Sequence, residues 1–258
     1  MIGQLVRYEL QEGVAFLTLN NPGRRNALSS ELLGELKELF REFDDDDAVR
    51  VVVLRSEGPV FSSGHDLNEI IDRDAEAYTA VFALCTEVME AIRLLPKPVI
   101  AQVQGLATAA GCQLVATCDL AVAAESASFA TPGVQIGLFC TTPGVALARS
   151  VATTKKAMEM LLTGTPVLAS EALEIGLINR VVPDEDLEVS VAALARQIAG
   201  ASAQTLAIGK PAFYRQIELD RPAAYDVAQK VMVDNLLKED AHEGITAFLQ
   251  KRDPEWKY

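Results

Sequence analysis

The 258-residue chain lacks the features that mark several large classes of protein. It has 23 Lys and Arg against 36 Asp and Glu, a net charge of −13, and therefore no cationic excess for binding nucleic acid. No apolar run approaches the roughly 20 residues of a membrane-spanning helix. The N-terminal residues have neither the apolar stretch of a signal peptide nor the basic, Ser-rich character of a transit peptide. We expect neither nucleic acid nor membrane as a partner.

Cysteine is also scarce. Cys85, Cys112, Cys118 and Cys140 show no metal-ligand spacing, so no metal site is expected. Cys112 and Cys118 fall in an apolar helical pattern, which predicts buried, reduced thiols. A reducing cytoplasm is the simplest compartment for such a protein, and cytoplasmic is the predicted location.

Half of the residues are hydrophobic, enough to fill the core of one substantial domain, with or without a small appended one. Apolar patterning indicates strands at 13–19, 49–54, 98–103 and 120–124, with helices from about 30 to 43 and up to about 95. Beyond residue 155 it indicates helices at 155–162, 169–175, 186–199, 203–215 and 222–237. We predict an α/β layer fold with mainly parallel strands over 1–195 and a helical C-terminal part over 196–258.

The segment 105–119 carries the strongest indication of a site. A predicted strand runs into a turn of small residues, and an apolar helix follows at once. Around Ala110 and Gly111 a ligand would meet bare backbone, and the N–H groups of the first helical turn would point at it. This geometry suits a developing oxyanion. The next polar residue is Gln113, an amide where acid/base catalysis would need a carboxylate.

Seven stretches, taken in order, resemble the crotonase superfamily, also called the enoyl-CoA hydratase/isomerase family. They are residues 19–28 (LNNPGRRNAL), 60–67 (VFSSGHDL), 97–100 (KPVI), 111–119 (GCQL followed by CD), 157–164 (AMEMLLTG), 169–177 (ASEALEIGL) and 243–252 (EGITAFLQKR). Within the family the sequence is most similar to the enoyl-CoA-hydratase-domain-containing subgroup that lacks both catalytic glutamates, which shares the Phe-Ser-Ser-Gly-His-Asp-Leu string.

The resemblance implies a spiral of β-β-α units, as in ClpP-like folds, with a C-terminal helical domain used in trimerisation. It also implies a homotrimer or a dimer of trimers. The expected ligand is an acyl-CoA thioester, so CoA enters as part of the substrate and no cofactor is permanently bound.

By position, the resemblance assigns the two backbone N–H groups that grip the thioester oxygen to His65 and Ala110. Each such donor stabilises an oxyanion by about 3–4 kcal/mol. The CoA molecule is anionic and needs nearby cations, for which Arg24 and Arg25 are the candidates. The residues that match the family's CoA-lining positions are Arg24, Arg25, Ala27, Ser63, Asp66, Leu67, Phe248 and Lys251.

The sequence departs from the family at both catalytic glutamates, which are replaced by Gln113 and Gly133. An amide and a glycine supply neither a base nor an acid, and each such group contributes about 10²–10⁴-fold to rate. We therefore expect weak or absent hydration. The family's single-base isomerases rely on the second position, so isomerisation is disfavoured too.

Other functions remain open on the same scaffold. Decarboxylation makes an enolate by loss of carbon dioxide and needs no base. The string at 64–66 is similar to that of methylmalonyl-CoA decarboxylases, although Cys140 stands where those enzymes carry Tyr. Thioester hydrolysis is a further alternative, and so is a non-catalytic acyl-CoA binding or regulatory protein.

Three polar side chains have two interpretations each. His65 either binds a carboxylate or contributes only its backbone amide. Gln113 either orients water or ligand, or is a buried amide with satisfied hydrogen bonds. Asp119 follows the helix, which favours a structural anchor over a catalytic base.

Overall fold

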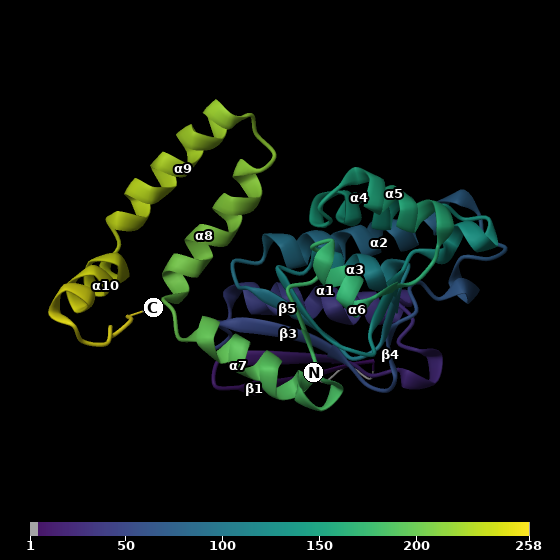
Figure 1. Ribbon diagram of the computed structural model, residues 1–258, viewed down its shortest axis with the longest axis horizontal. Coiled ribbons are helices and arrows are strands. Elements are labelled where there is room, and N and C mark those ends of the chain that lie inside the picture. The colour runs from purple at the N-terminus through teal and green to yellow at the C-terminus, as the bar shows by residue number, and fades with distance from the viewer. Residues whose placement is uncertain (1–4, 258) are drawn as a thin grey trace.

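Two β-sheets form the centre of the computed structural model, which describes residues 5–257 (Figure 1). The larger sheet has six strands in the order β1-β2-β3-β5-β7-β10, and only the β1–β2 pair is antiparallel. The smaller sheet has four strands in the order β4-β6-β8-β9, with β4, β6 and β8 parallel. The strands are β1 Val6–Gln11, β2 Val14–Leu19, β3 Val51–Ser56, β4 Val60–Ser62, β5 Val99–Val103, β6 Leu106–Thr108, β7 Leu120–Ala124, β8 Ser128–Ala130, β9 Val167–Leu168 and β10 Arg180–Val182.

Successive turns of the chain give one strand to each sheet before a helix follows. β3 and β4 precede α2, β5 and β6 precede α3, and β7 and β8 precede α4. This is the spiral of β-β-α units expected from the sequence. The helices are α1 Ser30–Asp45, α2 Ala75–Leu94, α3 Ala110–Thr117, α4 Thr141–Ser150, α5 Thr154–Thr163, α6 Ala169–Glu174, α7 Leu187–Ala199, α8 Ala203–Gln216, α9 Arg221–Leu236 and α10 Glu239–Gln250, with short 3-10 helices at Pro22–Arg24, Leu67–Glu69, Pro132–Ile136 and Asp184–Asp186.

Alternation along β3 fills both sides of the large sheet. Val52 and Leu54 join the main core with α1 and α2, whereas Val51 and Val53 face α7 in a second cluster. Successive side chains of a strand point to opposite faces, so a run of four apolar residues is what a sheet covered on both sides requires. The packed sheet therefore supports the turn of small residues that precedes α3.

The C-terminal helices extend away from the sheets. In Figure 1, α8 and α9 form an antiparallel pair that projects from the core, and α10 packs at the end of the pair where α8 begins, opposite the α8–α9 loop. Neither α8 nor α9 contains a buried residue. Within the described residues, no helix has the length and apolar character needed to cross a membrane.

Most predicted elements appear within two residues of their expected bounds, and the differences have simple causes. β4, β6 and β8 have only three residues each, too few for an alternating pattern. β6 therefore lies inside the segment predicted as a turn, and α10 was not predicted. The boundary between residues 195 and 196 falls within α7 and stays a prediction.

Candidate functional site

Two bends of the chain lie against each other. One is at Gly64, after β4, and the other is at Ala109, before α3. The φ of +84° at Gly64 belongs to the left-handed region that favours glycine. A Cβ at this position would lie 2.9 Å from the Cβ of Ala109, 3.0 Å from the carbonyl oxygen of Thr108 and 3.1 Å from the amide nitrogen of Ala110. The backbone before His65 therefore lies directly against the start of α3, because no side chain separates them.

A second glycine and a buried asparagine lock this arrangement. A Cβ on Gly111 would lie 2.5 Å from the carbonyl oxygen of Ser62, so only glycine fits there. The Ser62 hydroxyl donates to the carbonyl of Asn26 at 2.8 Å, and the Asn26 amide donates to the carbonyls of Glu57 at 2.9 Å and Val60 at 2.8 Å. Sequence reasoning did not single out Asn26 or Ser62, although both are polar residues within the two family-like strings.

The amides of His65 and Ala110 remain available at this junction. The residue before α3, Ala109, has φ +51° and ψ −119°, a strained conformation for a side chain with a Cβ, and no side chain caps the helix. Within residues 5–257, neither the His65 nor the Ala110 nitrogen donates a hydrogen bond to the protein. Two unpartnered donors thus come from adjoining bends, and the role in binding a thioester oxygen that the resemblance assigns to them stays a prediction.

The His65 ring is held by packing and not by hydrogen bonds. Both ring nitrogens are buried without a partner in the described chain, and the ring meets Phe82 edge-on with centroids 5.2 Å apart. Burial lowers the pKa of His65, and the neighbouring Leu28 backbone and Glu69 oppose the shift only in part. The imidazole is therefore neutral near pH 7.

The candidate CoA-binding residues of the motifs at 19–28 and 60–67 lie close together. Arg24 and Asp66 form an ion pair of 2.8 Å between Nη1 and Oδ2. The Ser63 amide donates to the carbonyl of Arg25 at 3.0 Å. The Asn68 backbone amide, together with its side chain and Arg24, holds the pKa of Asp66 below its usual value. Leu67 is exposed next to this group and Ala27 is buried beneath it.

The two C-terminal candidates are not brought to this group within one chain. Phe248 lies on α10 with 83% of its surface exposed, and Lys251 ends that helix in the left-handed conformation. Helix α10 packs against α8 and α9, far from the two bends (Figure 1). Their role in binding CoA stays a prediction, and it depends on a second copy of the chain.

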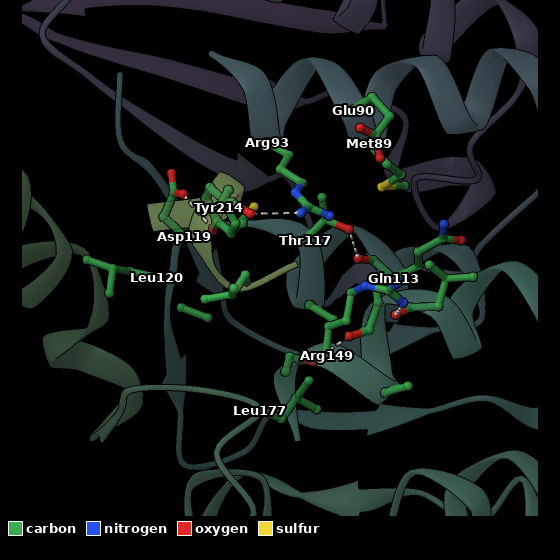
Figure 2. A pocket seen from close by; sticks show the side chains of 18 of the residues that line it. Met89, Glu90, Arg93, Gln113, Thr117, Asp119, Leu120, Arg149, Leu177 and Tyr214 are labelled. Atoms are coloured by element: carbon green, nitrogen blue, oxygen red, sulfur yellow. Dashed lines mark hydrogen bonds between the residues drawn. The ribbon is translucent and has the colours of Figure 1, made fainter. Parts of the chain in front are cut away.

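Gln113 reaches a cavity of about 810 Å³ between the core and α8. Its side chain is 6% exposed, and its Oε1 atom is buried with no hydrogen-bond partner in the described chain. The described chain leaves Oε1 without a hydrogen bond, so Gln113 is not a fully satisfied buried amide, and its role in orienting water or ligand stays a prediction. Among residues 5–257, three carboxylates line the cavity: Glu90 of α2 and Asp119 after α3, both labelled in Figure 2, and Glu218 after α8.

Neighbouring residues fill the space beside Gly133, the position of the second family glutamate. A Cβ on Gly133 would lie 2.7 Å from the Sγ atom of Cys140 and still closer to the carbonyl oxygen of Leu138. The Leu138 amide also donates to the Gly133 carbonyl at 2.8 Å, which fixes this fold-back. With this backbone, no side chain of any kind can project from residue 133.

Asp119 has the structural role that the sequence favoured. Its carboxylate accepts hydrogen bonds from the Val99 amide at 2.7 Å and from the Tyr214 hydroxyl at 2.8 Å. The carboxylate thus joins β5 and α8 just beyond the end of α3. Lys210 also pairs with Oδ2 of this carboxylate at 2.7 Å, so three groups from separate elements hold Asp119.

Comparison with known proteins finds the same family that the motifs indicate. Residues 9–258 match the family model described as enoyl-CoA hydratase/isomerase. Mouse enoyl-CoA hydratase domain-containing protein 3, mitochondrial, is 51% identical over 250 residues, covering 96% of this chain and 83% of the relative. The solved structure of its human counterpart has a TM-score of 0.95 at 49% identity, covering 98% of this chain and all (100%) of that one. An enoyl-CoA hydratase structure from Mycobacterium smegmatis has a TM-score of 0.96 at 49% identity, covering 98% and 99%.

The predicted cytoplasmic location is wrong on this comparison, because the mouse, rat and human relatives are named mitochondrial. The prediction rested on the cysteines. All four are buried and free, and burial raises the pKa of Cys85 to about 11 and of Cys112 to about 12. Thiols shielded in this way are inert in any compartment, so they carry no information about location.

Proposed function

Because the chain belongs to the enoyl-CoA hydratase/isomerase family, we propose that it binds an acyl-CoA thioester but hydrates enoyl-CoA weakly or not at all. The thioester oxygen would accept hydrogen bonds from the backbone amides of His65 and Ala110. The free amides, the strained Ala109 and the bare backbone at Gly64 support this assignment. CoA would enter as part of the substrate, beside Arg24, Arg25, Ser63 and Asp66.

The observation that carries the proposal is the closure of the chain over Gly133. Water addition needs one group to activate water and another to protonate the α-carbon, and each is worth about 10²–10⁴-fold. Gln113 supplies no base at the first position. At the second, Cys140 and the Leu138 carbonyl occupy the space of any side chain. The two amides would polarise the thioester of a bound enoyl-CoA. Neither residue 113 nor residue 133 would then activate water or protonate the α-carbon.

Decarboxylation is the second candidate reaction. When an acyl-CoA with a carboxylate on its α-carbon loses carbon dioxide, the bond's electron pair passes into the thioester as an enolate. The amides of His65 and Ala110 would stabilise its oxygen, and no base is required. The same closed Gly133 that disfavours hydration leaves this reaction unaffected. Thioester hydrolysis needs an activated water and is supported less.

Self-association is supported by the apolar surface of the C-terminal helices. Side chains of this size are rarely left in water over so many turns without a partner surface. We propose a homotrimer or a dimer of trimers, in which Phe248 and Lys251 approach the CoA of a neighbouring copy. The exposed apolar residues on α8, α9, α10 and their connections include Phe213, Ile217, Leu219, Tyr225, Met232, Val233, Leu236, Leu237, Ile245, Phe248 and Leu249.

The proposed function is tested by pairing binding with product analysis. Isothermal titration with crotonyl-CoA and malonyl-CoA measures binding, and mass spectrometry of the same mixtures detects hydration, hydrolysis or loss of carbon dioxide. Binding without hydration supports the proposal, and carbon dioxide release from malonyl-CoA supports the second candidate. Binding with no product from any thioester indicates a non-catalytic binding protein. Absence of binding contradicts the proposal outright.

A further inference from the structure

Two arginines at the far end of the cavity share one carboxylate oxygen. Arg93 of α2 donates through Nη2 to Oε1 of Glu218 at 3.0 Å, and Arg149 of α4 donates through Nε to the same atom at 3.5 Å. The three side chains come from separate parts of the chain, and all of them line the cavity that Gln113 also lines. Figure 2 shows Arg93, Arg149 and Gln113 in this cavity. The two arginine cations therefore share a single carboxylate, which lies just after α8.

The donors of these arginines are only partly used. Arg93 also donates weakly to the Tyr214 carbonyl at 3.5 Å, and Arg149 donates to the Val145 carbonyl of its own helix at 3.2 Å. Within the described chain, Nη2 of Arg149 has no partner. A guanidinium binds a carboxylate best through two parallel N–H bonds, which neither arginine makes with Glu218. Arg149 and Glu218 are 50% and 46% exposed, so both can turn.

The lining of this cavity begins one helical turn from the proposed thioester site, at Gln113. Gln113 stands one turn beyond Ala110 on α3, and Thr117 follows on the same face one turn further. From Ala110 to Thr117 the helix advances about 10 Å. The Gln113 side chain lines the cavity on this face of α3, and its Oε1 atom is buried without a hydrogen-bond partner in the described chain. An extended acyl chain that starts at the two amides and follows α3 would end near Arg149.

Resting on the proposed function, we propose that the preferred ligand is an acyl-CoA whose far end carries a carboxylate, a dicarboxylic acyl thioester. Its terminal carboxylate would bind Arg149 and Arg93 and take the place of Glu218. The other charges at the cavity fit this exchange. Asp119 is neutralised by Lys210 at 2.7 Å, and Glu90 is exposed. Glu218 is thus the internal competitor of the ligand, held by the same two cations.

The experiment compares suberyl-CoA with octanoyl-CoA, which have the same chain length and differ in the terminal carboxylate. Isothermal titration of the full-length protein is expected to give about tenfold or tighter binding of suberyl-CoA. Arg149→Gln should reduce that preference, by weakening suberyl-CoA binding more than octanoyl-CoA binding. Glu218→Gln should strengthen suberyl-CoA binding, since it removes the competitor. Arg41→Gln is the matched control, because Arg41 pairs only with Glu38 on the surface of α1.

The two variants are expected to change the affinity for suberyl-CoA in opposite directions. This difference separates ligand recognition from a structural role. If the trio only held α8 in place, Glu218→Gln would weaken binding or leave it unchanged, and that result overturns the inference. Equal affinity for the two thioesters also overturns it, while acyl-CoA binding itself stands. If neither thioester binds, the proposed function fails and this inference with it. Melting temperatures of the variants within a few degrees of the parent verify that each remains folded.

Discussion

The Nζ atom of Lys210 lies 2.7 Å from Oδ2 of Asp119, and the two side chains are only 8% and 15% exposed. Lys210 belongs to α8 and Asp119 follows α3, so this ion pair joins the projecting C-terminal helices to the spiral. Lys210 also donates to the carbonyls of Ile92 at 2.8 Å and Lys97 at 2.9 Å. The contact fixes α8 as one wall of the cavity.

Replacement of Asp119 by Ala is expected to lower the free energy of unfolding by about 3–5 kcal/mol, because it leaves the buried Lys210 ammonium without its counter-ion. Urea denaturation at fixed protein concentration measures the change. The exposed Arg41–Glu38 pair provides the comparison, and Glu38→Ala should cost less than about 1 kcal/mol. Equal effects of the two changes would show that Asp119 does not anchor α8.

Replacement of Gly64 by Ala is expected to weaken acyl-CoA binding by about tenfold or more. The methyl group meets Ala109 and Ala110, and the φ of +84° strains any residue with a Cβ. Isothermal titration gives the affinity. Gly23→Ala is the control, since Gly23 lies in the neighbouring turn with no heavy atom within 4 Å of the added carbon. Unchanged affinity in Gly64→Ala would place the thioester somewhere else.

Restoring the first carboxylate should help hydration more than restoring the second. Gln113→Glu is expected to raise crotonyl-CoA hydration measurably, yet leave it about 10² or more below an enzyme with both groups. Gly133→Glu should destabilise the protein and add no activity, because Leu138 and Cys140 fill the space. Absorbance of the enoyl thioester follows the rate. An active, stable Gly133→Glu protein would refute the closure of this position.

The stability of the protein should depend on His65 in mild acid. Burial lowers the pKa of His65 below 6.5 in the folded state, so the unfolded chain binds more protons at pH values below about 6.5. The stabilisation that comes from a neutral His65 is complete above that pH and is lost as the pH falls through the folded pKa. The loss has a slope of up to about 1.4 kcal/mol per pH unit.

Urea denaturation of the parent and of His65→Gln, from about pH 7.5 to about pH 5, tests this dependence. The difference in unfolding free energy should be flat in the upper part of the range and shrink in the lower part. Acyl-CoA binding by His65→Gln should remain, because the backbone amide is unchanged. Loss of binding in this variant would assign the role to the imidazole ring.

The sequence predicted the features that depend on local pattern. The strands β2, β3 and β5 follow from their apolar runs, and the helix predicted from about residue 30 is α1, which the Ser29 side chain caps by accepting from the Leu32 amide. The anchoring role of Asp119 followed from its place after the helix. Such features need only neighbouring residues, so a single chain reveals them.

The rest depends on segments that meet only in three dimensions. Gly133 is closed by a carbonyl five residues later, which no spacing rule foretells. The Arg93, Arg149 and Glu218 group draws on α2, α4 and the end of α8. Asn26 is visible as a residue of a family-like string, but its bonds to Glu57 and Val60 appear only in the fold.

Crotonyl-CoA mixed with the purified protein tests the central claim most directly, by measuring affinity and hydration rate on one sample. Our account predicts saturable binding that Gly64→Ala weakens, with hydration close to the rate without protein and unchanged by Glu90→Gln. Turnover at ordinary enzyme rates, about 1–10³ per second, would contradict it. Loss of that turnover in Glu90→Gln would identify the carboxylate responsible.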